Sequence, residues 1–427
     1  GGRPFAGLGA GVLLQAPVPG SGAAARRARR GEAVVEAAPS HLPTTIAPAA
    51  RSLRQPAWRQ VVDGIVGWVG APVRFLRISL MTKEVVADVK GRFRSQWKEK
   101  RRLGNSTGSG GGASRTLETL LPTYLMGHVI ARTDPAHYRE LLNTSLTLLL
   151  SSIMAEEPYP FKPFHEAIRG PDVDYYAWGN DFFRSMVKYR SSRVEGLDRV
   201  GEIKRLLVAG ENVMLLANHQ TEADPQVLSI LLELEGHGDL AERCVFVAGH
   251  KVTTDPLAVP FSMGRNLLTI FSKKYLDTFP PDEKEAKSAR NQQTVGEIQR
   301  LLKEGGTLIW VAPSGGRDRR GRESGEFEPA AFDASSVGLF LLLAMKAQKA
   351  SGHATHFFPL AMWTHGLVPP PDGQQANVGE SRSAARAPVA LEFGPELDVS
   401  GGRKKFPALA EKAVREHYSH LRSLMSG

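Results

Sequence analysis

The feature that most limits the possible folds of this chain is an alternation of short apolar segments with segments of helical periodicity, from residue 197 to residue 424. The short segments predict strands and the periodic ones predict helices. The expected strands are 213–218, 243–249, 267–272, 307–312, 356–363 and 388–394, and the expected helices are 197–209, 225–235, 285–303, 334–350 and 406–424. This order predicts an α/β domain with a mixed, mostly parallel sheet flanked by helices. Ligands of such sheets bind outside the carboxyl ends of the strands.

Composition divides the chain into three parts. Residues 1–54 are rich in Ala, Gly, Pro and Arg, with no acidic residue before Glu32. This tail is typical of an organelle transit peptide, and a basic or disordered linker is the alternative. Residues 55–155 carry helical patterns and predict a smaller helical subdomain with a Gly/Ser linker at 104–114. Residues 156–427 are expected to form the α/β domain.

The basic charge lies in the N-terminal quarter of the chain. The formal net charge is +10, but residues 1–104 contain 18 Lys and Arg against 6 Asp and Glu, and the remainder is nearly neutral. A nearly neutral main domain argues against nucleic-acid binding. The basic stretch 92–102 follows an amphipathic segment that starts at Trp58. Three interpretations stay open: contact with a membrane surface, contact with an acidic partner, or packing on the main domain with a solvated charged face.

Cysteine content and hydropathy exclude two further classes of protein. The single cysteine, Cys244, excludes an internal disulfide framework and a thiolate metal cluster, and its apolar neighbours predict burial. No apolar run approaches the roughly 18 residues that are needed to span a bilayer. We therefore expect a soluble protein and not an integral membrane protein.

The segment Asn218-His219-Gln220-Thr221-Glu222-Ala223-Asp224-Pro225 directly follows the expected strand 213–218. Asp224 and Pro225 are typical of a helix start. If the chain turns here, the Asp224 carboxylate can accept the Nδ1–H of His219, which leaves Nε2 as a general base. The spacing alone is also compatible with His219 ending the strand and Asp224 merely capping the helix.

A second segment of this kind, Ala312-Pro313-Ser314-Gly315-Gly316-Arg317-Asp318-Arg319, follows the expected strand 307–312. The guanidinium groups of Arg317 and Arg319 match phosphate oxygens, and paired glycines let backbone N–H groups approach the same anion. A base and an anion site at one sheet edge indicate a phosphorylated alcohol as substrate.

Four blocks of the sequence carry a family resemblance. They are Asn218 to Pro225, Phe261 to Asn266 with Ser272-Lys273-Lys274, Ala312 to Arg319, and Phe358-Pro359-Leu360-Ala361. Together they resemble the soluble, plastid-type glycerol-3-phosphate acyltransferases, over roughly residues 150–400. The resemblance implies an enzyme of the chloroplast stroma. It would transfer a fatty acyl group from acyl-[acyl carrier protein], or from acyl-CoA, to the primary hydroxyl of glycerol 3-phosphate. The product would be 1-acyl-glycerol 3-phosphate, a lysophosphatidic acid, in the first step of glycerolipid synthesis.

The resemblance also implies roles for single residues. His219 and Asp224 would form the catalytic pair, and the phosphate would be bound by Lys274, Arg317 and Arg319. No metal and no cofactor is expected, because the acyl thioester supplies its own leaving group. Tyr275 stands where the family usually has histidine, so it can donate a hydrogen bond to the phosphate but adds no charge.

Two questions stay open at this level. Arg265 could contact the phosphate or the phosphopantetheine of the acyl donor, or it could pair with an acidic residue structurally. A lysophosphatidic acid acyltransferase is a related alternative function, although such enzymes as a family usually carry membrane segments. A catalytically silent phosphate- or lipid-binding protein on the same scaffold is the alternative from another class, and the intact His219 and Asp224 argue against it.

Overall fold

The computed structural model describes residues 76–88, 91, 110–271, 276, 279–321, 323–370 and 382–426, with the backbone alone in 110–118. The tail 1–54, the amphipathic segment that starts at Trp58 and the basic stretch 92–102 lie outside these residues.

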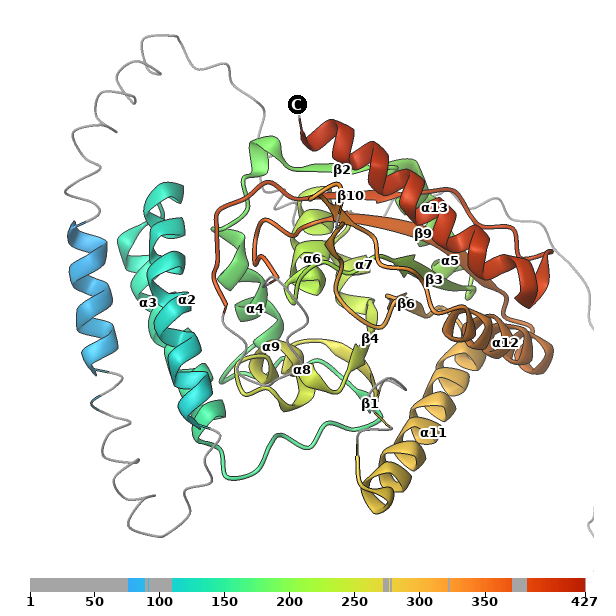
Figure 1. Cartoon of the computed structure of the whole chain (residues 1–427), viewed down its shortest axis with the longest axis horizontal. Coiled ribbons are helices and arrows are strands. Elements are labelled where there is room, and N and C mark those ends of the chain that lie inside the picture. The colour runs from blue at the N-terminus through green and yellow to red at the C-terminus, as the bar shows by residue number, and fades with distance from the viewer. Residues whose placement is uncertain are drawn as a thin grey trace, which may run out of the picture. The chain divides into compact units, whose positions relative to one another are not determined.

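The described chain is built around an eight-stranded sheet of order β1-β5-β4-β6-β3-β9-β10-β2 (Figure 1). Its strands are β1 (Phe164–His165), β2 (Arg193–Glu195), β3 (Asn212–Ala217), β4 (Val245–Gly249), β5 (Asn266–Ile270), β6 (Leu308–Val311), β9 (Thr355–Trp363) and β10 (Ala390–Phe393). The five central strands β5, β4, β6, β3 and β9 are mutually parallel. Strand β10 runs antiparallel to β9, and β1 runs antiparallel to β5. The mixed, mostly parallel sheet expected from the sequence is therefore confirmed.

Helices cover both faces of this sheet. They are α2 (Gly110–Ala131), α3 (Pro135–Met154), α4 (Tyr175–Arg184), α5 (Leu197–Val208), α6 (Asp224–Leu234), α7 (Gly238–Arg243), α8 (Lys251–Thr254), α9 (Val259–Met263), α11 (Pro281–Glu304), α12 (Ala334–Ser351) and α13 (Gly402–Met425). Successive side chains of a strand point to opposite faces. Accordingly Val213 and Leu215 of β3 pack in the core formed with α4, α5 and α6, whereas Met214 and Leu216 pack with α11, α12 and α13. Strand β3 is therefore buried on both faces, as its continuous apolar run predicts.

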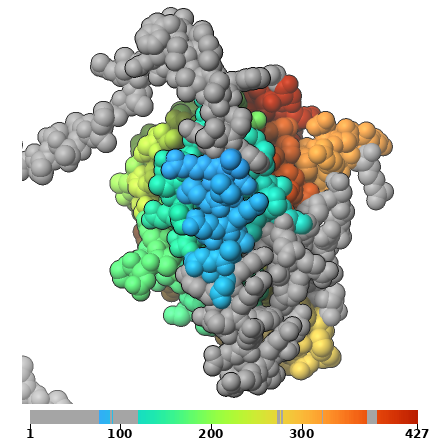
Figure 2. Space-filling model, turned by 90° about the vertical axis from the view of Figure 1, so that its left-hand side faces the viewer, coloured from blue at the N-terminus to red at the C-terminus, as the bar shows by residue number. Residues whose placement is uncertain are grey.

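The N-terminal part of the described chain is helical, as expected. Residues 76–88 form a helix that lies on the outside of α2 and α3 (Figure 2). Its buried side chains Ile78 and Val85 belong to one apolar cluster with Tyr138 and Leu142 of α3. Helix α2 begins at Gly110, inside the segment 104–114 that the sequence predicts as a linker. The linker prediction is thus wrong for residues 110–114, because the helix that follows extends back through these glycines.

The six expected strands and five expected helices of the α/β domain are all found, with ends that differ by a few residues. The structure adds the short strands β1 and β2, the helices α4 and α7 to α9, and a hairpin of β7 (Arg319–Arg320) and β8 (Phe327–Glu328). None of the described helices combines the length and the apolar character that crossing a bilayer requires.

Candidate active site

The carboxyl ends of the parallel strands bring the two chemical segments together. Because β3 and β6 are neighbours and parallel, the turn after Ala217 lies beside the turn after Val311. The N–H of Asp318 donates to the carbonyl of His219 over 2.6 Å, and Asn218 Nδ2 donates to Asp318 Oδ2 over 2.7 Å. The His219 turn and the Arg317 turn therefore form one hydrogen-bonded unit.

His219 and Asp224 are in direct contact. His219 Nδ1 lies 2.8 Å from Asp224 Oδ2, which makes the imidazole a donor at Nδ1 and leaves Nε2 as the acceptor. The Asp224 side chain is fully buried, whereas the His219 side chain is 25% exposed. Helix α6 begins at Asp224, one residue before the expected start, so Ala223 and not Asp224 takes the cap position. The geometry is that of a solvent-accessible base oriented by a buried carboxylate.

Four donors converge on the Asp224 carboxylate. Besides His219 Nδ1, the N–H groups of Gln220 and Thr221 donate over 2.8 and 3.3 Å, and Thr364 Oγ1 donates over 2.5 Å. Thr364 follows the carboxyl end of β9, the strand next to β3. Donors of this kind stabilise the ionised carboxylate. The Asp224 carboxylate is thus fixed beside the imidazole, where it can stabilise an imidazolium.

We expect Thr364→Val to lower kcat about 5- to 10-fold, because it removes one donor to Asp224 while keeping the side-chain shape. Loss of this buried hydrogen bond should also lower the free energy of unfolding by about 1–3 kcal/mol. Steady-state kinetics and thermal unfolding measure the two effects. Thr364→Ser, which keeps the hydroxyl, is the matched control. A valine variant with the kcat of the wild type would contradict the role of Thr364.

The loop after β6 places Arg317 beside the His219 turn. Gly315 has a φ of +64°, a conformation that suits glycine, and its N–H donates to the carbonyl of Ala312. The Arg317 side chain is 14% exposed, and its Nη1 lies 3.8 Å from Glu222 Oε1. Arg319 Nη1 instead donates to the carbonyls of Arg317 and Asp318, over 3.2 and 3.0 Å. These two hydrogen bonds support the loop that carries Arg317, and the contact of Arg319 with the phosphate stays a prediction.

Lys274 and Tyr275, the other two residues expected at the phosphate, lie outside the described residues. The strand before them, β5, ends at Ile270. Strand β5 is parallel to β4, β4 to β6, and β6 to β3, so β5 ends on the same sheet edge as the His219 turn. Their roles stay predictions.

Arg265 lies elsewhere than the phosphate site. It precedes β5, at the amino end of the parallel strands, on the sheet edge opposite His219. Its guanidinium is buried, donates over 2.7 Å to Ser229 and also to Asn180, and lies 4.7 Å from the Tyr176 ring centroid. Burial lowers the pKa of Arg265 to about 10. The structure thus favours a structural role, with neutral partners in direct contact in place of the acidic residue that the sequence suggested.

Three further polar residues of this edge were not among the predicted site residues. Thr364 binds Asp224 as described, and Asp318 is fully buried, which raises the pKa of its carboxyl to about 6. Arg382 donates to Glu222 over 2.7 and 3.0 Å and to Asp255 over 2.7 Å. Their hydrogen bonds to Asp224, Asn218, Glu222 and Asp255 span 100 to 160 positions of the chain, so no local pattern could have indicated these contacts.

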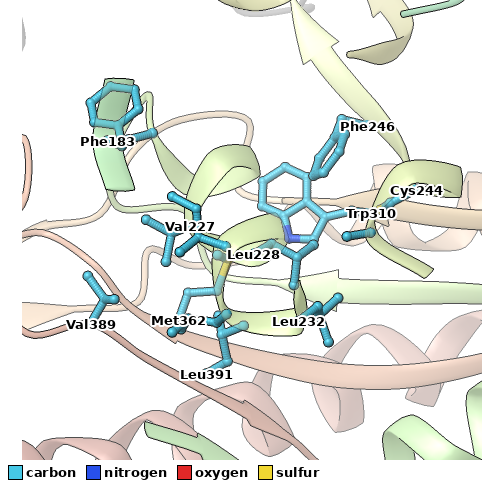
Figure 3. Packing of buried hydrophobic residues seen from close by; sticks show 14 of the residues in the cluster. Phe183, Val227, Leu228, Leu232, Cys244, Phe246, Trp310, Met362, Val389 and Leu391 are labelled. Carbon is cyan, nitrogen blue, oxygen red and sulfur yellow. The ribbon is translucent and has the colours of Figure 1, made fainter. Parts of the chain in front are cut away.

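An apolar interior lies directly beneath the base. The Trp310 ring of β6 meets the His219 ring edge-on, with 5.9 Å between ring centroids. Figure 3 shows Trp310 among Phe246, Leu228 and Leu232 in the core that fills this face of the sheet. Among the described residues, no group of three His, Cys, Asp or Glu side chains is arranged to hold a metal ion. The arrangement is suited to proton transfer at His219 Nε2 on an anion-bearing substrate.

Comparison with known proteins agrees with this geometry. A family model described as Acyltransferase matches residues 191–363, which contain both turns. A chloroplastic glycerol-3-phosphate acyltransferase of Cucurbita moschata is 39% identical over 284 residues, which cover 66% of this chain and 59% of the Cucurbita protein. The chloroplastic glycerol-3-phosphate acyltransferase of Spinacia oleracea is 35% identical over 304 residues, which cover 68% of this chain and 63% of the Spinacia protein. The enzyme of Carthamus tinctorius is 33% identical over 326 residues, covering 74% of this chain and 69% of its own.

The chain belongs to the family of chloroplastic glycerol-3-phosphate acyltransferases. The matched part spans about three fifths of the length of the Cucurbita and Spinacia proteins. Each of these relatives is named chloroplastic, which confirms the plastid localisation expected from the sequence.

Proposed function

We propose that this protein transfers a fatty acyl group from a thioester to the primary hydroxyl of glycerol 3-phosphate and so forms lysophosphatidic acid. The observation that carries the proposal is the placement of the His219–Asp224 pair and Arg317 in hydrogen-bonded neighbouring turns at one sheet edge. The relatives' names, which specify glycerol-3-phosphate acyltransferases, support the same reaction.

The proposed chemistry needs one base and one anion site. His219 Nε2 takes the proton of the hydroxyl as its oxygen attacks the thioester carbonyl carbon. The carbon–sulfur bond then breaks, and the imidazolium returns its proton to the departing thiolate. Asp224 stabilises the imidazolium between these steps. Arg317, with Lys274 and Arg319, would hold the phosphate and fix the hydroxyl close to Nε2, so that binding energy is converted into proximity.

The acyl donor and the partners are proposed from the family resemblance. Acyl-[acyl carrier protein] is the favoured donor and acyl-CoA the second, with no metal or cofactor taking part. Contact with a membrane surface or an acidic carrier through residues 92–102 stays a prediction, since those residues lie outside the described ones. Lysophosphatidic acid as the acceptor is the second candidate. We favour glycerol 3-phosphate, because it is the acceptor named for the relatives.

Arg317→Ala tests the anion site directly. We expect it to raise the KM for glycerol 3-phosphate about 10- to 100-fold with little change in kcat, because about 1.5–3 kcal/mol of charge-assisted hydrogen bonding is lost. Activity with glycerol, which has no phosphate, should not fall. Arg320→Ala, at an exposed arginine of the same loop, should leave the KM unchanged. Equal KM values for the wild type and Arg317→Ala would remove Arg317 from the phosphate site.

A further inference from the structure

Arg382 joins three loops at the edge of the site. Its guanidinium donates to both carboxylate oxygens of Glu222 and to Oδ2 of Asp255, and its side chain is 10% exposed. The second Asp255 oxygen, Oδ1, accepts the N–H of Leu257, so this carboxylate is also fixed by its own turn. One buried cation thus binds two carboxylates in a forked arrangement that arginine is suited to make.

Glu222 connects this contact to the proposed phosphate site. It lies in the turn between His219 and Asp224, and Arg317 Nη1 lies 3.8 Å from its Oε1. Arg382 is closer, at 2.7 and 3.0 Å. Burial alone would raise the pKa of Glu222, but Arg382, with Arg317, outweighs burial and holds that pKa below its ordinary value. Glu222 is therefore an anion beside the guanidinium that is proposed to bind phosphate.

An anion in this position works against phosphate binding in two ways. It repels the phosphate dianion, and it competes with the phosphate for Arg317. Both effects weaken when Glu222 is bound by a second cation, because a carboxylate held bidentately by arginine is largely neutralised and fixed in place. Arg382 supplies that cation, and it binds Asp255 at the same time.

The backbone that carries Arg382 is held by the N-terminal helical part. Thr119 Oγ1 of α2 donates to the Arg382 carbonyl over 3.2 Å, and the Ala384 N–H donates to Thr123 Oγ1 over 3.0 Å. These two contacts, one helical turn apart on α2, fix the segment at 382–384. Helix α2 thus has a structural connection to the catalytic turn through Arg382 and Glu222.

We propose that Arg382 is a positioning residue of the phosphate site. By holding both oxygens of Glu222, it keeps this carboxylate from pairing closely with Arg317 and so lets Arg317 bind the substrate phosphate. The role rests on the proposed function, in which Arg317 binds the phosphate of glycerol 3-phosphate. Arg382 itself acts through Glu222 and takes no part in the acyl transfer.

The test uses Arg382→Met, which keeps the buried stem and removes the fork. We expect about a tenfold increase in both the calorimetric Kd and the KM for glycerol 3-phosphate, with kcat within about threefold of the wild type. Adding Glu222→Gln should return both constants to within about threefold of the wild type, because the competing charge is gone. A purely structural role would not give this reversal.

If the methionine variant does not fold, Arg382→Lys is measured alone and with Glu222→Gln. We then expect a smaller increase in the Kd and KM, with the same reversal.

Arg300→Ala is the matched control, since Arg300 also binds two carboxylates, Glu297 and Glu304, on the exposed surface of α11. It should leave the Kd and KM unchanged. An Arg382 variant with the Kd of the wild type would overturn the proposal, and so would a double variant whose Kd is no lower than that of the single variant. In either case the proposed function still holds as long as the wild type acylates glycerol 3-phosphate. A wild-type protein that neither binds nor acylates glycerol 3-phosphate would overturn both.

Discussion

His219→Ala is expected to lower kcat for acyl transfer to glycerol 3-phosphate by about 10³-fold, with little change in KM. The imidazole is 25% exposed and oriented by Asp224 over 2.8 Å, so it is placed to take the hydroxyl proton in the proposed reaction. General acid–base catalysis by one residue contributes about 10²- to 10⁴-fold. The phosphate is proposed to bind Arg317 and not the imidazole, so substrate affinity should persist. Initial rates at varied glycerol 3-phosphate concentration separate the two constants.

A matched histidine controls for nonspecific effects. His356 also pairs with a carboxylate through Nδ1, at 2.8 Å from Glu396 Oε1, but it lies near the amino end of β9. His356→Ala should therefore keep the kcat of the wild type. If His219→Ala kept a rate within about tenfold of the wild type, proton transfer by this histidine would not limit the reaction, and its role as the base would be lost.

Asp224→Asn is expected to lower kcat by a comparable factor, about 10²- to 10⁴-fold, and to reduce stability as well. The carboxylate accepts from four donors, two at each oxygen. An amide replaces one acceptor by an N–H₂ group, which then faces donors in a buried space. The imidazole would lose its tautomer or its orientation, and the free energy of unfolding should fall by about 1–3 kcal/mol. Steady-state kinetics and thermal unfolding measure both effects.

Asp134 offers the matched control for this change. It also precedes a proline at a helix start, where it accepts from the N–H groups of Ala136 and His137. Asp134→Asn should change stability slightly and kcat not at all. An Asp224→Asn variant with nearly the kcat of the wild type would show that the carboxylate does not orient or stabilise the imidazole.

The central strands could be predicted from the sequence because they are buried on both faces and therefore form continuous apolar runs. Strand β3 is the clearest case, since all six of its residues are buried. Strands β1 and β2 have two and three residues, too few to establish a period. The hairpin β7–β8 is equally short, and its pairing places Arg319 beside Glu328.

The site was predictable where it depends on local spacing. His219 and Asp224 lie five residues apart in one turn, so a strand followed by a helix start is enough to suggest their contact. Arg382, Thr364 and Asp318 reach the site through tertiary structure, from loops more than 90 residues from the turn. Arg265, for which a substrate contact and a structural role were both open, is buried at the opposite edge of the sheet, and its place in the sequence near the phosphate blocks could not decide between them. Whether a residue lies at the carboxyl or the amino edge of the sheet depends on the order and direction of the strands, which the local sequence does not reveal.

The most direct measurement follows radiolabelled glycerol 3-phosphate, incubated with the purified protein and an acyl-[acyl carrier protein] thioester, and identifies the labelled product by chromatography. We expect labelled lysophosphatidic acid from the wild type and from His356→Ala, and nearly none from His219→Ala at equal protein concentration. Absence of this product from the folded wild type would overturn the proposed reaction, and equal amounts from the wild type and His219→Ala would overturn the role of His219 as its base.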